Sequence, residues 1–286
     1  MNSELESKLI VSLSNSDMHF FYANQQEVNA KSLHNIIENG IGYSVIQHAT
    51  SSPSATLWPI VLEHFGDIFS ITKPSQESMR LIHLDKSKSK YFKELTVEKR
   101  TLGEKKAEEI LCADWVQDLS GLLEKDIVDA YYNGYATFTW RLTRPYQASD
   151  FRPLHKDAWF ELSAGRKEIF DDTQSKHLQR ISAWIPLNTI EGKSGLYVAP
   201  KSQLSDHESF SMVRDGIHIK PRISQKDLVD SEPKYAITPE GTIALWGPNF
   251  LHGGAPNISN ECRISVEFTL CSKDQSLYDT YTQRSN

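Results

Sequence analysis

Four residues in the second half of the sequence have types and spacings that suit metal chemistry. His155 and Asp157 are two positions apart, so on a β-strand both side chains project from one face and can bind one ion together. His252 follows a turn-forming segment, and Arg263 lies further along the chain. Two histidines and a carboxylate around a metal, with the other positions open, form the facial arrangement of non-haem iron(II) sites. The sequence therefore predicts an iron site formed by His155, Asp157 and His252.

Strands and turns must position these residues, and the pattern after residue 130 favours strands. Apolar and polar side chains alternate over residues 137–143, 180–187 and 263–270. Turn-forming residues at 191–192, 194–195, 239–241 and 247–249 separate short strands. The polar faces carry arginine and adjoin the candidate ligands, which favours two sheets that close around a polar pocket. We therefore expect a mainly β fold with flanking helices and a double-stranded β-helix (jelly roll, cupin-like) core.

The first 130 residues carry mainly helical patterns. Helices are predicted at 32–40, 54–69 and 103–123, with a strand at 41–47, and the helices should pack outside the sheets. His64 and Trp115 fall on apolar helix faces, where packing roles are favoured. No repeat or linker interrupts the chain, so we expect a single domain over 1–286, with helix-rich support at 1–130 and the jelly-roll core at 131–275. Segments 163–177 and 202–239 are expected to be lids.

Composition excludes several classes of partner. The hydrophobic fraction of 39% and the charged fraction of 24% are ordinary for a globular protein. A net charge of −6 provides no basic footprint for nucleic acid or an anionic membrane. The three cysteines have no paired spacing, and the sequence shows neither a leader pattern nor a long apolar run. We therefore expect a cytoplasmic protein without disulfides that acts on a small-molecule substrate, and the oligomeric state is not indicated.

Longer stretches around the candidate ligands resemble the Fe(II)/2-oxoglutarate-dependent dioxygenases, and more narrowly the phytanoyl-CoA dioxygenase group. The resemblance lies in residues 154–157 (LHKD), 181–188 (ISAWIPLN), 194–202 (SGLYVAPKS), 241–246 (GTIALW) and 251–257 (LHGGAPN), followed by Arg263. It implies that His155, Asp157 and His252 bind Fe(II) and that Arg263 anchors the distal carboxylate of 2-oxoglutarate. Where some members have a serine two places after the distal histidine, this chain has Gly254.

The resemblance implies further contacts with the cosubstrate and the substrate. Trp184 is expected to lie against 2-oxoglutarate, and Thr143 or Arg141 to meet its other end. Ser265 shares the predicted face of Arg263 and is a candidate to assist it. The two aromatic residues that follow the ligands, Trp159 and Phe160, are candidate substrate contacts.

The implied reaction is hydroxylation of a small polar molecule, in which O2 and 2-oxoglutarate are consumed and succinate and CO2 are released. Asp157 argues against the related halogenases, in which a small residue replaces the carboxylate. Desaturation, epoxidation or cyclisation would use the same ligands. The sequence is also compatible with a non-catalytic cupin-like protein that binds a metal or a small acid, and with a protein hydroxylase, which would present an open groove in place of a lidded pocket.

Overall fold

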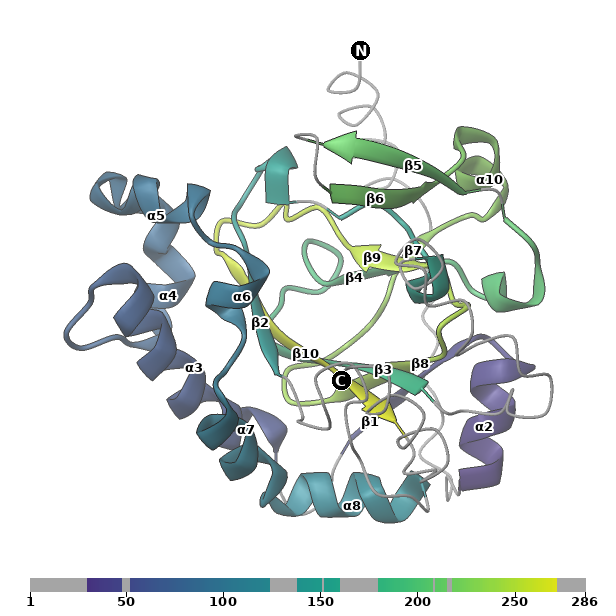
Figure 1. Ribbon diagram of the computed structural model, residues 1–286, viewed down its shortest axis with the longest axis horizontal. Coiled ribbons are helices and arrows are strands. Elements are labelled where there is room, and N and C mark those ends of the chain that lie inside the picture. Colours follow the sequence, from purple (N-terminus) through teal and green to yellow (C-terminus); the bar gives the residue numbers. More distant parts are fainter. Residues whose placement is uncertain are drawn as a thin grey trace, which may run out of the picture.

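Helices flank antiparallel strands in the computed structural model of the chain (Figure 1), which describes residues 30–47, 52–123, 138–150, 152–159, 180–207, 209–214 and 218–271. The helices are α2 (Ala30–Glu38), α3 (Pro53–Phe69), α4 (Gln76–Leu81), α5 (Ser89–Lys93), α6 (Val97–Arg100), α7 (Glu104–Leu111), α8 (Asp114–Leu123) and α10 (Gln225–Asp230). The strands are β1 (Tyr43–Ile46), β2 (Thr139–Thr143), β3 (Arg180–Asn188), β4 (Leu196–Val198), β5 (Ser209–Arg214), β6 (His218–Ile223), β7 (Lys234–Tyr235), β8 (Ile243–Trp246), β9 (His252–Gly254) and β10 (Arg263–Cys271).

Five strands form one antiparallel sheet in the order β1-β8-β3-β10-β2. Residues that pair directly across neighbouring strands project from the same face of a sheet. The pairs on the polar face are Arg263 with Thr143, Ser265 with Arg141, and Glu267 with Trp184. The alternation predicted for the strands is therefore confirmed, and the sheet gathers the polar side chains of β2, β3 and β10 on one side.

The apolar face of this sheet packs against the helices of the N-terminal half, as predicted. Trp140 of β2 meets Phe65 of α3 edge-on, and its indole N–H donates to Nδ1 of His64 at 3.1 Å. Trp115 of α8 meets Phe268 of β10 in the same cluster of buried residues. Because burial of this face removes a large apolar area from water, it supplies the main stabilisation of the sheet–helix layer. His64 and Trp115 have the packing roles that their helix faces predict.

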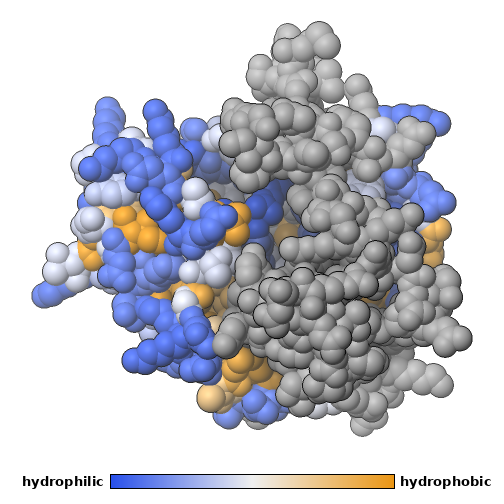
Figure 2. Space-filling view, in the orientation of Figure 1, coloured by the Kyte–Doolittle hydropathy of each residue, from blue (hydrophilic) through white to orange (hydrophobic). Residues whose placement is uncertain are grey.

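The prediction of one continuous helix over residues 103–123 is wrong. α7 ends at Leu111, and α8 begins at Asp114. An aspartate is favourable in the first turn of a helix, where its carboxylate complements the exposed N–H groups. Between α3 and α6 the chain also forms the short helices α4 and α5, where the sequence pattern predicts no element. Blue, hydrophilic side chains predominate over the outer side of this helical layer (Figure 2).

A second antiparallel sheet has the strand order β7-β4-β9. The chain passes from one sheet to the other: β3, β8 and β10 belong to the five-stranded sheet, and β4, β7 and β9 to the three-stranded sheet. Trp184 and Trp246 from the first sheet are buried with Leu196 and Val198 of β4 and with Phe250. The polar face of the larger sheet is therefore turned toward the smaller sheet.

The predicted lid at 202–239 is not one irregular segment. It contains the antiparallel hairpin β5-β6, the helix α10 and the strand β7, which pairs with β4. Because β7 pairs with β4, the last part of this segment belongs to the three-stranded sheet, and the buried residues 236–238 follow directly. The predicted lid at 163–177 lies outside the described residues. Within the described ranges, no helix combines the length and the apolar character that a membrane crossing requires.

Candidate metal centre

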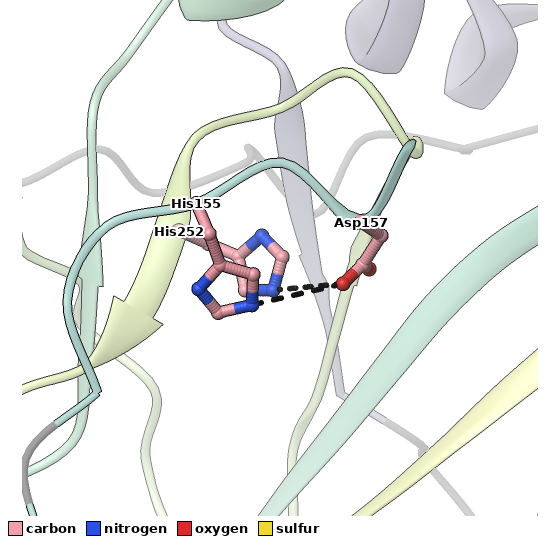
Figure 3. Close-up of side chains that lie close together, drawn as sticks. All are labelled: His155, Asp157 and His252. Carbon is pink, nitrogen blue, oxygen red and sulfur yellow. Dashed lines mark ion pairs between the residues drawn. The ribbon is translucent and has the colours of Figure 1, made fainter. Parts of the chain in front are cut away.

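The three predicted metal ligands come from two stretches of chain that lie side by side. His155 and His252 face each other across an antiparallel bridge, in which the backbone N–H of each donates to the carbonyl oxygen of the other, at 2.9 and 3.0 Å. His252 begins β9, which pairs with β4 on its other side. Asp157 begins a short helical turn over residues 157–159, and its carboxylate points toward both imidazoles (Figure 3).

The donor atoms of the three side chains converge. Oδ1 of Asp157 lies 3.8 Å from Nε2 of His155 and 3.6 Å from Nε2 of His252. All three ligand atoms lie within 4.8 Å of one another, so these residues can hold a metal ion. Imidazole nitrogens and carboxylate oxygens bind metals at about 2.0–2.2 Å, which puts neighbouring ligand atoms roughly 3 Å apart. Small side-chain rotations are therefore sufficient to complete the coordination.

Both imidazoles are oriented by the backbone. Nδ1 of His155 lies 2.9 Å from the carbonyl oxygen of Pro153, and Nδ1 of His252 lies 3.1 Å from that of Phe250. Because a carbonyl can only accept, each Nδ1 carries the proton, and the neutral ring presents the lone pair of Nε2 to the centre. The indole of Trp246 packs on His252 with ring centroids 4.5 Å apart. Backbone and packing contacts thus fix the orientation that a metal requires.

The electrostatics of the site favour the metal-binding protonation states. Burial raises the pKa of the Asp157 carboxyl, but His252, His155, the hydroxyl of Ser182 and the indole of Trp246 together outweigh burial and hold this pKa below the ordinary value. Ser182 donates to Oδ2 of Asp157 at 2.5 Å, which leaves Oδ1 facing the histidines. Burial, followed by the charge of His252, lowers the pKa of His155 to about 3. A carboxylate and neutral imidazoles are the forms that bind metals.

Arg263 is a buried cation on the polar face of the larger sheet. Its two terminal nitrogens donate to the carbonyl oxygen of Gly195 at 2.6 Å and to Oγ1 of Thr143 at 2.7 Å. Its Nε has no partner among the described residues, and it forms no ion pair among them. Burial, followed by the charge of Arg152, lowers its pKa to about 10. All the described partners of this buried guanidinium are neutral, and one of its N–H groups has no described acceptor. Such a group is suited to bind a carboxylate.

The structure brings the other predicted cosubstrate residues around Arg263. The guanidinium carbon of Arg263 lies 5.9 Å from the centroid of the Trp184 ring. Thr143 contacts Arg263 directly, whereas Arg141 is ion-paired with Glu267 and keeps an Nε without a described partner. The hydroxyl of Ser265 is fully buried without a partner among the described residues. Thr143, Arg141 and Ser265 share the face that carries Arg263.

The sequence pattern did not identify two residues that belong to this site. Ser182 contacts Asp157, although the alternation of β3 shows only that it shares a face with Trp184. Arg152 precedes the ligands in a segment without periodicity, so no pattern marks it. Of the two predicted substrate contacts, Trp159 is half-buried and packs against the buried cluster that includes Leu154, while Phe160 lies outside the described residues.

Neither a protein-family model nor a curated protein matches the sequence. Solved structures with a similar arrangement include EctD from S. alaskensis with 2-oxoglutarate and 5-hydroxyectoine, at 14% identity and a TM-score of 0.48 over 89% of this chain and 80% of that chain. EvdO2 from Micromonospora carbonacea var. aurantiaca, complexed with 2-oxoglutarate, has 13% identity and a TM-score of 0.49 over 89% and 94% of the two chains. AviO1 from Streptomyces viridochromogenes Tue57 has 11% identity and a TM-score of 0.46 over 87% and 98%. Similarity at this level assigns no function to this chain.

Proposed function

We propose that this chain is an iron(II)- and 2-oxoglutarate-dependent dioxygenase that hydroxylates a small polar molecule and releases succinate and CO2. One observation carries the proposal: His155, Asp157 and His252 converge with both Nδ1 atoms already bonded to carbonyls, and the buried cation Arg263 lies between the same two sheets. The facial set leaves open positions for a 2-oxo acid and dioxygen, and the guanidinium suits the second carboxylate of the acid.

We propose that the two sheets form a jelly roll, or double-stranded β-helix, within a single dioxygenase domain over 1–286. The strand order supports this proposal, because the chain passes from β2 to the His155 bridge, then to β3, β4, β7, β8, β9 and β10, and crosses repeatedly between the sheets. The core would occupy 131–275, with helix-rich support at 1–130. The hairpin β5-β6 and α10 would serve as part of a lid.

The donor set fits iron(II). Nε2 of His155, Nε2 of His252 and Oδ1 of Asp157 would hold the ion, and the hydroxyl of Ser182 would keep Oδ2 of Asp157 away from it. One-point binding by the carboxylate leaves more positions open than two-point binding would. When bound, iron(II) with 2-oxoglutarate supplies the dioxygen activation that oxidises a substrate C–H bond. The residues around the ion would position that bond and exclude water.

Arg263 would bind the distal carboxylate of 2-oxoglutarate. Thr143 accepts a hydrogen bond from Arg263, so we propose it for this end and not for the other end that the sequence predicts. Ser265, whose hydroxyl is buried without a described partner, would share the Arg263 end. The ring of Trp184 would lie along the cosubstrate. Arg141 is the candidate for the opposite end, because its Nε, which has no described partner, projects from the same face of the sheet.

Trp159 and Phe160 are proposed to contact the substrate, because they directly follow the metal ligands. Asp157 supports hydroxylation over halogenation, since its carboxylate occupies the position that a halide would need. Desaturation, epoxidation and cyclisation would use the same ligands and are distinguished by the product formed from a given substrate.

An anaerobic titration with Fe(II) and 2-oxoglutarate tests the proposal. We expect a visible charge-transfer band that requires both additions and is lost in His155→Ala. The matched control is His207→Ala, because His207 bonds through Nδ1 to the carbonyl of Ser205 and is not part of the ligand cluster. Absence of the band in the wild type would contradict the proposal and favour a non-catalytic cupin-like binder. A band that persists in His155→Ala would show that the ligand is misassigned.

A further inference from the structure

Arg152 is a cation beside the candidate site whose charge no described residue pairs. Its backbone N–H donates to the carbonyl oxygen of Gly254 at 3.4 Å, so it lies next to β9 just before His155. A methyl group on Gly254 would lie 3.4 Å from both terminal nitrogens of Arg263 and 3.7 Å from Cβ of Arg152. Arg152 and Arg263 therefore approach the site from the same edge of β9.

The charge of Arg152 affects the pKa values of several groups in the site. After burial, it is the main cause that lowers the pKa of both Arg141 and Arg263, and it also lowers the pKa of His155. The carboxylate of Asp157 acts on Arg152 in the opposite direction. The side chain of Arg152 therefore shares an electrostatic neighbourhood with the metal ligands and the other two guanidinium groups.

No described carboxylate is in direct contact with the side chain of Arg152. Its side chain has neither an ion pair nor a hydrogen bond within the described ranges, whereas Arg141 is ion-paired with Glu267. In this part of the structure three guanidinium groups, Arg141, Arg152 and Arg263, face two described carboxylates, Asp157 and Glu267, which leaves one positive charge. Asp150, which also acts on Arg263, is ion-paired with Arg144 and does not change this count. An iron(II) dication and a 2-oxoglutarate dianion cancel each other and leave that charge unchanged. Arg100 also acts on all three guanidinium groups, but the carboxylates of Asp150 and Glu98 act on Arg100 in the opposite direction, so it is not counted in this excess.

We propose that the substrate of this site carries an anionic group that binds to Arg152. This inference rests on the proposed function, and it adds the charge of the substrate. Arg263 and the ion would already satisfy both carboxylates of 2-oxoglutarate, so the remaining cation would be available to the substrate. A guanidinium binds a carboxylate or a phosphate through paired N–H groups, and both chemistries fit the residue. Because an unpaired charge is costly in a partly buried site, a neutral substrate would leave the cation uncompensated.

Binding of small probes to the iron- and 2-oxoglutarate-loaded protein tests the proposal without turnover. Propionate and methyl phosphate represent the two anionic chemistries, and propionamide is the neutral analogue of propionate. Saturating 2-oxoglutarate keeps Arg263 occupied. The readouts are the shift of the visible band and calorimetric affinity under anaerobic conditions, measured for the wild type, Arg152→Gln and Arg152→Lys. Arg80→Gln is the control, since Arg80 lies 4.0 Å from Glu240 and outside this cluster.

We expect at least one anion to bind and propionamide not to bind. Arg152→Gln should weaken binding of the anion about tenfold or more, Arg152→Lys should weaken it less, and Arg80→Gln should leave it unchanged. The affinity for 2-oxoglutarate should change less than about twofold in all variants. Preference for phosphate over carboxylate would identify the group that Arg152 binds.

Three results would overturn the inference. Equal binding of propionamide and propionate would show that charge is not recognised, and unchanged anion affinity in both Arg152 variants would show that Arg152 is not the partner. A large loss of 2-oxoglutarate affinity would assign Arg152 to the cosubstrate. If Arg152→Gln does not fold, Arg152→Lys alone decides, because lysine cannot form paired hydrogen bonds with the anion: a weaker affinity supports the inference, and an unchanged affinity overturns it. A wild type without the visible band would instead refute the proposed function itself.

Discussion

Replacement of Arg263 by alanine should abolish tight binding of 2-oxoglutarate while the metal still binds. The guanidinium uses one N–H for the carbonyl of Gly195 and another for Thr143, and its Nε is orphaned among the described residues. Truncation of one partner of a buried, hydrogen-bonded charge pair costs about 2–5 kcal/mol. At about 1.4 kcal/mol per tenfold change, the affinity should fall roughly 30- to 4,000-fold.

The assay is an anaerobic titration of the iron-loaded variant with 2-oxoglutarate, followed by the visible band and by calorimetry. Arg263→Lys should lie between alanine and the wild type, because lysine keeps a charge but cannot form paired hydrogen bonds with a carboxylate. Arg144→Gln is a folded control with wild-type affinity, since Arg144 pairs with Asp150 and packs over Phe92. An affinity for Arg263→Ala within about threefold of the wild type would refute the anchor role, because the loss expected for a buried charge pair is far larger.

Three further predictions concern a metal ligand, the backbone packing beside His252 and a buried thiol. Ser182→Ala should lower iron(II) affinity about 10- to 100-fold in competition with a chelating indicator, because the Asp157 carboxylate loses its hydrogen bond; an unchanged affinity would contradict that role. Gly253→Ala should lower the free energy of unfolding, measured by urea denaturation, by about 1–3 kcal/mol, because the added methyl would lie 2.6 Å from the carbonyl oxygen of Arg152. The control Gly121→Ala has open space around the added methyl and should be neutral or raise stability. Equal effects of the two substitutions would contradict the packing. Cys262 is buried with its pKa raised to about 12, so little thiolate forms below that pH, and peptide mapping after iodoacetamide treatment at pH 8–9 should show labelling of the exposed Cys112 but not of Cys262.

The sequence allowed the faces of the strands to be predicted, because alternation has a period of two and each strand carries its own pattern. Arg263, Ser265 and Trp184 accordingly lie on the face expected for them. Register is different, since it depends on pairing between distant strands. The pattern could not show that Thr143 lies opposite Arg263 while Arg141 lies opposite Ser265, and this register decides which residue meets the anchor.

Contacts made outside regular elements were the least predictable. Arg152 lies between a turn and the metal ligands, where neither helical nor strand periodicity marks a face. The helical pattern at 103–123 is continuous by residue type, yet the helix is interrupted between Leu111 and Asp114. The spacing of hydrophobic residues does not reveal such a short interruption. Ser182 was placed on the correct face, but its bond to Asp157 depends on how the sheets meet.

Anomalous diffraction from crystals loaded anaerobically with Fe(II) tests the metal centre most directly. We expect one strong peak at the iron edge, about 2.0–2.3 Å from Nε2 of His155, Nε2 of His252 and Oδ1 of Asp157, with the Nδ1 atoms still bonded to Pro153 and Phe250. A peak bound elsewhere, or an empty position among these three side chains at saturating Fe(II), would contradict the assignment of the ligands.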